Sequence, residues 1–135
     1  MIYGIGVDLV NVPRIGRVID KWGNRFIQRV FTAREIRFCL HSSKSVSRFA
    51  LRFAAKEAFS KAIGLGMRKG VRWQDIEVFH HPSGQPDLSV AGNTLILCHR
   101  EEITGWHITL SDEGDYGVAV VVLEKHGAGG SAHTA

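Results

Sequence analysis

The chain of 135 residues has few features of secreted, membrane-spanning or zinc-binding proteins. It has two cysteines, Cys39 and Cys98, which lie among apolar neighbours and show no metal-binding spacing. No apolar run approaches the roughly 20 residues of a membrane-spanning helix. The N-terminus lacks the basic region of a signal peptide. We therefore expect a cytoplasmic protein with reduced thiols, one domain over residues 1–125 and a flexible tail over 126–135.

Acidic residues are scarce in the first half of the chain, although the formal net charge is only +4. Residues 1–72 hold 15 of the 17 Lys and Arg side chains, whereas residues 73–135 hold nine of the 13 Asp and Glu side chains. Such an asymmetry indicates an anionic partner for the first half. Four classes of anionic partner fit: a nucleic acid, a membrane surface, a phosphorylated small molecule or an acidic protein.

Hydrophobic periodicity predicts an α+β fold with an early strand, then helices, then a strand-rich C-terminal half. A cap at Asn11 and a capping box of Thr32 and Glu35 mark two helix starts. The expected elements are a strand over 2–10, a helix over 12–22, a helix over 32–40, a long helix over 46–63, a strand from about 71, a helix around 95–103 and a hairpin of strands over 106–111 and 116–124.

Two of the predicted strands have unusual faces. In the first, bulky apolar residues alternate with Gly4, Gly6 and Asp8, so one face has almost no bulk and leaves room beside the carboxylate. The last strand is apolar on both faces over residues 118–123. It needs cover on both sides, which we expect from a helix on one side and another subunit on the other.

Polar side chains recur every four residues along the long predicted helix, at Arg48, Arg52, Lys56 and Ser60. Residues at this spacing form one ridge of a helix. Like charges there repel by roughly a few tenths of a kcal/mol per pair, and an anionic partner would relieve that repulsion. The alternative is a solvated helix face with no ligand.

Two carboxylates within this basic half suggest a magnesium site. Asp8 ends the strand that lacks bulk, and Glu57 lies at the edge of the predicted buried stripe, where a carboxylate is costly unless it is paired or binds a metal. Mg²⁺ takes a few carboxylate oxygens together with waters and substrate phosphates. A surface ion pair between Glu57 and Lys61 is the structural alternative.

The remaining candidate groups give weaker signals. Gly64 and Gly66 follow the long helix without the pattern of a nucleotide-binding loop, so they either let N–H groups approach a phosphate or end the helix. No histidine has a second metal ligand at a suitable spacing, and Ser111 lacks the surroundings of a catalytic nucleophile. No hydrolase site is expected.

Five short segments carry a family resemblance. In chain order they are Gly4–Leu9 (GIGVDL), Phe31–Glu35 (FTARE), Arg52–Ala62 (RFAAKEAFSKA), Gly84–Pro86 (GQP) and Thr109–Asp112 (TLSD). Together they resemble the holo-acyl-carrier-protein synthases, the small trimeric bacterial type of 4'-phosphopantetheinyl transferase. Each motif alone is loose, whereas the ordered set, which spans positions 4 to about 124, is specific.

The resemblance implies an α+β 4'-phosphopantetheinyl transferase-like fold with an antiparallel sheet packed against a long central helix. It implies Mg²⁺-dependent transfer of 4'-phosphopantetheine from coenzyme A to a serine of apo-acyl carrier protein, with release of adenosine 3',5'-bisphosphate, in fatty acid biosynthesis. The partners would be the carrier protein and coenzyme A, with no nucleic acid and no membrane. The protein would be a homotrimer with sites between subunits.

Matching the motifs residue by residue implies the site residues. Asp8 and Glu57 would be the metal ligands and, with Lys61, the catalytic residues. Basic residues of the first helix would meet the acidic carrier protein; they are Arg14, Arg17 and Lys21. The residues along the coenzyme A site would be Arg48, Arg52, Phe53, Lys56, Ser60, Lys61, Gly64, Gly66, Gly84, Pro86 and Asp112.

Two positions depart from the family pattern. Asp112 stands where many members have His, and Leu65 replaces the threonine of a common Gly-Thr-Gly. The group that deprotonates the serine stays open among Glu57, Asp112 and a metal-bound water directed by Glu35. Two other classes of protein are alternatives: a small nucleic-acid-binding module that uses the basic ridge, and an oligomeric structural protein whose basic face only aids solubility.

Overall fold

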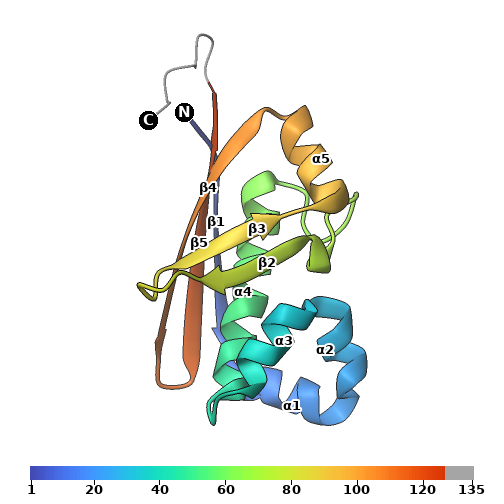
Figure 1. Cartoon of the computed structure of the whole chain (residues 1–135), viewed down its shortest axis with the longest axis vertical. Helices are drawn as coiled ribbons and strands as arrows, with labels where there is room; N and C mark the ends of the chain where they lie inside the picture. Colours follow the sequence, from blue (N-terminus) through green and yellow to red (C-terminus); the bar gives the residue numbers. More distant parts are fainter. Residues whose placement is uncertain (127–135) are drawn as a thin grey trace.

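Three antiparallel strands form the main sheet. In the computed structural model, which describes residues 1–126, strand β5 (Tyr116–Lys125) lies between β1 (Ile2–Asn11) and β4 (Ile103–Glu113). Both pairings are antiparallel, and β4 and β5 form the predicted hairpin. The helices pack against this sheet on one side, which confirms the α+β class (Figure 1). The predicted tail lies, from residue 127 on, outside the described residues.

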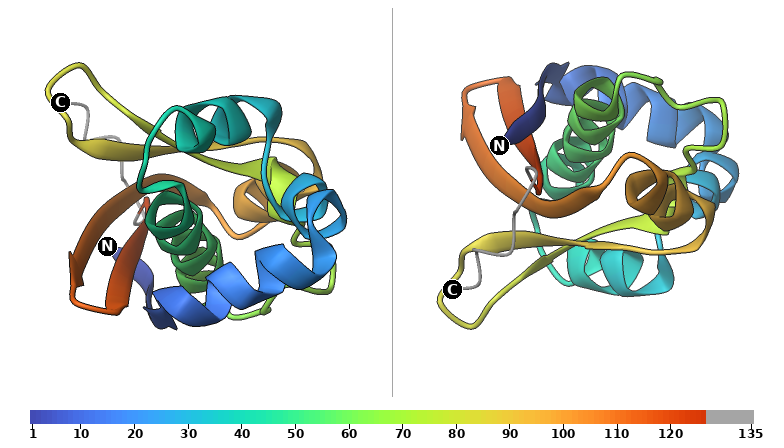
Figure 2. Two further views of the ribbon diagram at one scale, coloured as in Figure 1. Left: turned by 90° about the horizontal axis from the view of Figure 1, so that it is seen from below. Right: turned by 90° about the horizontal axis from the view of Figure 1, so that it is seen from above.

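Helix α4 (Ser45–Ile63) packs on the inner face of the sheet at very short range. A Cβ atom on Gly6 would lie 1.9 Å from the carbonyl oxygen of Ala58, and one on Gly4 would lie 2.0 Å from that of Ala62. Only glycine permits such an approach of helix to strand. The helix itself therefore fills much of the room predicted along this face, and α4 lies enclosed by the sheet and the other helices (Figure 2).

Three shorter helices follow β1. Helix α1 (Val12–Trp22) has the predicted cap at Asn11, whose Oδ1 atom accepts a hydrogen bond from the N–H three residues later at 2.9 Å. Helix α3 (Ala33–Leu40) begins with the predicted capping box at Thr32. The sequence does not predict α2 (Asn24–Val30), because its seven residues are too few to show a clear helical period.

A second sheet of two antiparallel strands follows α4. A 3₁₀ turn, η1 (Trp73–Asp75), leads into β2 (Ile76–His80), which pairs with β3 (Pro86–Val90), and helix α5 (Gly92–Arg100) follows. The sequence does not predict β3, because its first residue belongs to a run of turn-forming residues. Proline is tolerated at the first position of a strand. Strand β2 packs against α3 and α4, and β3 packs against β4.

The outer face of the main sheet is apolar and open. Ile5, Val7 and Leu9 of β1 are 61%, 53% and 67% exposed. Each is paired in register with a half-buried valine of β5. The inner face of β5 is fully buried by α4, as predicted for one side of residues 118–123. The valines on the other side are only half-buried in the single chain.

The hydrophobic core surrounds α4 and extends to both sheets. A second, smaller cluster joins α2 and α3 to the first half of α4. Cys39 and Cys98 are both buried free thiols, as predicted. Among the described residues, no helix is long and apolar enough to cross a membrane.

Candidate functional site

Asp8, Glu57 and Lys61 come together where β1 meets α4, and we call them the carboxylate–lysine cluster. The Nζ atom of Lys61 donates to Oδ1 of Asp8 at 2.9 Å and to the carbonyl oxygen of Val7 at 3.1 Å. Glu57 lies one helical turn before Lys61, on the same side of α4. Lys61 therefore forms its ion pair with Asp8 and not with Glu57, the pair that the sequence offered as the structural alternative.

The electrostatics of the cluster favour a bound cation. Burial and, next, the negative charge of Asp8 raise the pKa of the Glu57 carboxyl above 4.5, while Lys61 opposes the shift. A cation between the two carboxylates would offset this repulsion. The side chain of Lys61 is 52% exposed and that of Asp8 16%, so a ligand has access.

The donor set fits Mg²⁺ in part. Within residues 1–126, no group of three or more His, Cys, Asp or Glu side chains is placed to hold a metal ion. Two carboxylates leave most of an octahedral shell to other oxygens. Asp8 and Glu57 therefore fit a Mg²⁺ ion whose remaining ligands are waters and oxygens of a phosphorylated substrate.

A cleft of about 510 Å³, which we call the large cleft, opens beside the first half of α4. Arg48 and Arg52 line it from α4, Gly84 and Pro86 from the β2–β3 hairpin, and Asp112 from β4. The fold thus brings together five residues that the sequence assigns to one site. Arg48 precedes the glutamate of the carboxylate–lysine cluster by nine residues, roughly 14 Å along the helix axis. The large cleft and the cluster can therefore hold two parts of one elongated ligand.

The predicted ridge of α4 is buried over most of its length. Arg52 is 2% exposed and Lys56 0%. The Nζ atom of Lys56 donates to Oε1 of Glu35 at 2.7 Å and to the carbonyl oxygens of Val30 and Trp73 at 2.8 and 3.0 Å. These three acceptors use all the protons of the ammonium group. The prediction that this ridge binds an anion along its whole length is therefore wrong. Lys56 has no donor left for coenzyme A.

Glu35 completes this buried network. Its Oε1 atom also accepts from the N–H of Thr32 at 2.9 Å, and its Oε2 atom accepts from the N–H of Val78 at 2.8 Å. The residue is 1% exposed. Its carboxylate joins α3, α4 and β2, and burial leaves it no route to a metal-bound water. The alternative in which Glu35 directs such a water is therefore wrong.

Four other residues assigned to the coenzyme A site have internal partners. Phe53 packs in an aromatic cluster with residues of α2 and η1. The hydroxyl of Ser60 donates to the carbonyl oxygen of Glu57 at 2.6 Å. Gly64, at φ 88°, closes α4, and the N–H groups of Gly64 and Gly66 donate to the Ser60 carbonyl at 3.2 and 3.1 Å. The two glycines end the helix, which is one of the two roles that the sequence left open.

The basic residues predicted to meet a carrier protein lie exposed on α1. Arg14, Arg17 and Lys21 follow one another at spacings of three and four residues, which places them on one face. A cleft of about 360 Å³ lies beside this face and extends it onto α2; its lining residues are Val18, Trp22, Arg25, Phe26 and Arg29. The sequence reasoning missed this cleft because it did not predict α2.

The large cleft also contains two aromatic residues that the sequence reasoning missed, Phe38 and His80. Their rings stack with centroids 5.4 Å apart at 15°, and we call this pair the Phe38–His80 stack. The guanidinium carbons of Arg48 and Arg52 lie 4.1 and 4.3 Å from the Phe38 ring centroid. Burial and then these two charges lower the pKa of His80. No sequence signal relates Phe38 to His80, because only the packing of α3 against β2 brings them together.

Comparison with known proteins gives one consistent family. A family model described as ACPS, 4'-phosphopantetheinyl transferase superfamily, matches residues 4–121. A holo-[acyl-carrier-protein] synthase of Geobacter sulfurreducens is 42% identical over 125 residues, which cover 93% of this chain and 99% of that protein. A protein of the same name from Koribacter versatilis is 45% identical, over 92% of this chain and 99% of its own.

Solved structures agree with the sequence matches. The holo-[acyl-carrier-protein] synthase of Neisseria meningitidis superposes with a TM-score of 0.87 at 38% identity, over 93% of this chain and 100% of that one. A holo-(acyl-carrier-protein) synthase of Bacillus anthracis in complex with CoA (3',5'-ADP) gives a TM-score of 0.77 at 36% identity, over 93% and 98%. The similarity therefore extends over nearly the whole chain.

Proposed function

Because the chain belongs to the 4'-phosphopantetheinyl transferase superfamily, we propose that it transfers the 4'-phosphopantetheine group of coenzyme A to a serine of apo-acyl carrier protein. The products are holo-acyl carrier protein and adenosine 3',5'-bisphosphate. The observation that carries the proposal is the carboxylate–lysine cluster on the same helix as two arginines that line a large cleft. The nucleic-acid-binding alternative loses its support, because the ridge on which it depended is mostly buried.

In this proposal Asp8 and Glu57 hold Mg²⁺, which when bound neutralises charge on the diphosphate of coenzyme A. Lys61 adds a positive charge beside the same phosphates, since about half of its side chain remains open to solvent. The serine oxygen forms a bond to the phosphorus that carries the pantetheine. The bond from that phosphorus to the bridging oxygen breaks, and adenosine 3',5'-bisphosphate leaves.

We propose that the Glu57 carboxylate accepts the proton from the hydroxyl of the acceptor serine. The assignment rests on position, because Glu57 lies beside Asp8 and Lys61 in the cluster where the diphosphate is proposed to bind. The two competing assignments fit less well. Glu35 is saturated by internal hydrogen bonds, and Asp112 lines the large cleft together with Arg48.

The nucleotide end of coenzyme A is proposed to occupy the large cleft. Arg48 and Arg52 supply positive charge there, and Gly84 and Pro86 form an uncharged wall opposite α4. Asp112 lines the same cleft from β4. No direct contact with coenzyme A is proposed for the residues with internal partners; they are Phe53, Lys56, Ser60, Gly64 and Gly66.

The acyl carrier protein is proposed to dock on the exposed basic face of α1. Arg14 lies six residues after Asp8, and α1 follows β1 without a break. A carrier on this face would therefore present its serine close to the carboxylate–lysine cluster. The cleft beside Trp22 offers apolar contact next to the charges, a combination that suits an acidic partner with an apolar anchor.

A homotrimer is proposed for the assembly, with the exposed face of the main sheet as the contact. Ile5, Val7 and Leu9 form a continuous apolar strip that monomers rarely leave open. Val7→Asp should convert the assembly to monomers in size-exclusion chromatography with light scattering. A wild-type protein that is already monomeric would contradict this part of the proposal. Fatty acid biosynthesis as the process and a cytoplasmic location stay predictions.

The decisive experiment is a direct assay of transfer. The protein is mixed with apo-acyl carrier protein, coenzyme A and Mg²⁺, and intact-mass spectrometry should detect the phosphopantetheine adduct. Controls omit coenzyme A, replace Mg²⁺ by a chelator, or use a carrier whose acceptor serine is alanine. Absence of the adduct with carriers of both fatty acid and secondary metabolism would overturn the proposed function.

A further inference from the structure

The buried ion pair of Glu35 and Lys56, which we call the Glu35–Lys56 pair, has no role in the function proposed above. Its side chains are 0% exposed and 2.7 Å apart. A buried ion pair by itself is weak evidence for stability, because well-packed apolar residues of similar volume often stabilise a fold equally well. The contacts of this pair with neighbouring elements therefore need a further explanation.

The pair joins three elements that form walls of the large cleft. Glu35 belongs to α3, and its Oε1 atom accepts a hydrogen bond from Nζ of Lys56 on α4. Its Oε2 atom accepts from the N–H of Val78 on β2 at 2.8 Å. One carboxylate thus fixes the positions of α4 and β2 relative to α3.

Each of these elements carries a residue of the large cleft close to its contact with the pair. Phe38 follows Glu35 by three residues, so it lies one turn further along α3. Arg52 precedes Lys56 by four residues, one turn back along α4. His80 ends β2, the strand that the carboxylate holds by its backbone. The pair therefore holds the backbone close to three cleft residues from three different elements.

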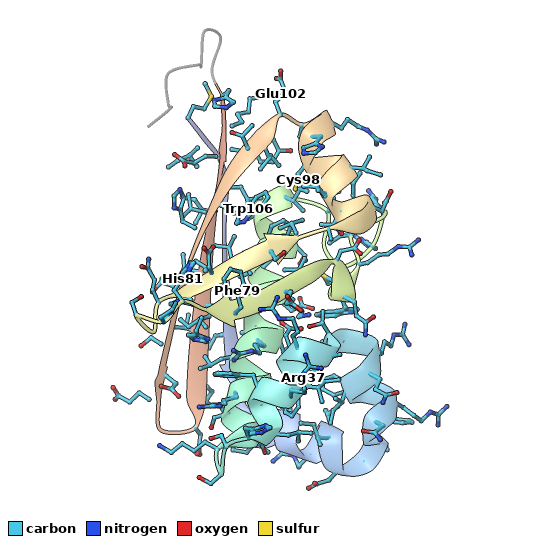
Figure 3. All side chains as sticks on the ribbon, in the orientation of Figure 1. Arg37, Phe79, His81, Cys98, Glu102 and Trp106 are labelled. Atoms are coloured by element: carbon cyan, nitrogen blue, oxygen red, sulfur yellow. The ribbon has the colours of Figure 1, made fainter. Side chains whose placement is uncertain are left out.

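The three cleft residues also contact one another. Phe38 stacks on His80 at 5.4 Å, and the guanidinium carbon of Arg52 lies 4.3 Å from the Phe38 ring centroid. The Nη2 atom of Arg52 donates to Nδ1 of His80 at 3.2 Å. Stacking and cation–π contacts require particular ring positions, so a small shift of one element would disturb all three contacts. Figure 3 labels Arg37 and Phe79, which precede Phe38 and His80 in the chain, on the contacting elements α3 and β2.

We propose that Glu35 and Lys56 are positioning residues for coenzyme A, which hold α3, α4 and β2 at the spacing that its nucleotide end requires. The inference rests on the proposed function, which places that end in the large cleft. Neither side chain touches the substrate, since both are buried. A misplacement of about 1 Å far from the reacting atoms can reduce activity roughly 100-fold, so an effect of this kind is measurable.

The main test is the double variant Glu35→Gln/Lys56→Met, which removes both charges and leaves no unpaired buried ion. Thr32 and Val78 donate to different oxygens of Glu35, whereas glutamine has only one acceptor oxygen, so the two donors cannot both keep their bonds. Steady-state kinetics should show KM for coenzyme A raised by at least about tenfold. KM for the carrier protein and kcat at saturation should stay within about twofold of the wild type.

Thr94→Val is the matched control for a loss of stability. Thr94 is 0% exposed, and its hydroxyl donates to Asp75 at 2.9 Å and accepts from the N–H of Arg72 at 3.0 Å, outside the large cleft. This variant also loses buried hydrogen bonds, so it should unfold at lower urea concentration with KM for coenzyme A unchanged. An equal rise of that KM in both variants would overturn the proposal. Glu35→Gln alone, with the same expected split between the two KM values, is the second variant in case the double variant does not fold.

A second readout, the pKa of His80, does not depend on transfer. Burial and then the charges of Arg52 and Arg48 hold this pKa below its ordinary value, and Phe38 stacks on the imidazole. Displacement of β2 from α4 would weaken these causes, so NMR titration should show a higher pKa in the double variant than in the wild type. Thr94→Val should leave the pKa unchanged. An unchanged pKa in the double variant would overturn the proposal.

Failure of this inference and failure of the proposed function give different results. If the wild type transfers phosphopantetheine and the double variant has the same KM for coenzyme A, only the positioning role is wrong. If the wild type transfers nothing, the proposed function is wrong, and calorimetry with coenzyme A still decides on the pair. Weaker binding of coenzyme A by the double variant than by the wild type would then support the positioning role, and equal binding would overturn it.

Discussion

Two lysine–carboxylate pairs lie five residues apart on α4 and have opposite properties. Lys56 and Glu35 are 2.7 Å apart with both side chains 0% exposed, whereas Lys61 and Asp8 are 2.9 Å apart with 52% and 16% of their side chains exposed. Every donor of Lys56 is used inside the protein. The second pair has open access and a second carboxylate beside it. Similar distances therefore accompany a structural pair in one case and a candidate site in the other.

Helix geometry explains the difference. Five residues rotate the side-chain direction by about 140° around a helix axis. Lys56 consequently points to α3 and η1, where carbonyl oxygens surround it, and Lys61 points to the exposed end of β1. Access and unused binding capacity, more than residue type or distance, distinguish the candidate site from the structural pair.

The largest expected effect is on the open cluster. Asp8→Ala and Glu57→Ala should each reduce Mg²⁺-dependent transfer by roughly 10³-fold, because each removes a carboxylate ligand of the Mg²⁺ ion proposed to neutralise the diphosphate. Intact-mass assays across a Mg²⁺ titration measure the rate, and circular dichroism confirms the fold. A wild-type rate in either variant would remove that residue from the metal site.

The next test compares the stability of the two pairs. Lys56→Met should lower the free energy of unfolding by about 3–5 kcal/mol, since it leaves the Glu35 carboxylate buried without its partner. Lys61→Met, the matched variant of the half-exposed pair, should cost about 1 kcal/mol or less. Urea unfolding followed by fluorescence measures both. Equal losses would mean that the two pairs do not differ in the way proposed.

A smaller effect is expected on the rate when Lys61 is replaced. Lys61→Met should lower kcat by roughly 10²-fold, because a single cation near the phosphates is lost. Lys61→Arg should retain more activity than Lys61→Met, since it keeps the charge without the same geometry. Steady-state assays at saturating coenzyme A and carrier protein distinguish the two variants. Loss of activity only in proportion to loss of folded protein would instead make Lys61 structural.

The smallest expected effect lies on α1, outside both pairs. Arg14→Glu should raise KM for the carrier protein by about tenfold at low salt, and leave KM for coenzyme A unchanged, because the charge reversal repels an acidic carrier. Arg100→Glu serves as the control for net charge. Equal changes in both KM values would place Arg14 at the coenzyme A site instead.

Most elements of the fold could be predicted from the sequence because their signals are local. The Asn11 cap, the Thr32 capping box and the alternation in β1, β4 and β5 depend on neighbouring residues only. Helix α2 escaped prediction, since seven residues give too little periodicity to decide, and β3 escaped because its first residue belongs to a run of turn-forming residues. The large cleft depends on both the β2–β3 hairpin, whose second strand was not predicted, and the packing of α3 against β2.

The sequence by itself determined the family, most of the elements and the identity of the residues at the candidate site, Asp8, Glu57 and Lys61. The tertiary structure alone decided which polar residues of α4 face inward. The four-residue spacing of Arg48, Arg52, Lys56 and Ser60 places them on one ridge, but it does not say what packs against that ridge. The direction of burial depends on contacts with α2, α3 and β2, which are distant in sequence, and those contacts convert a predicted binding surface into a buried ion pair.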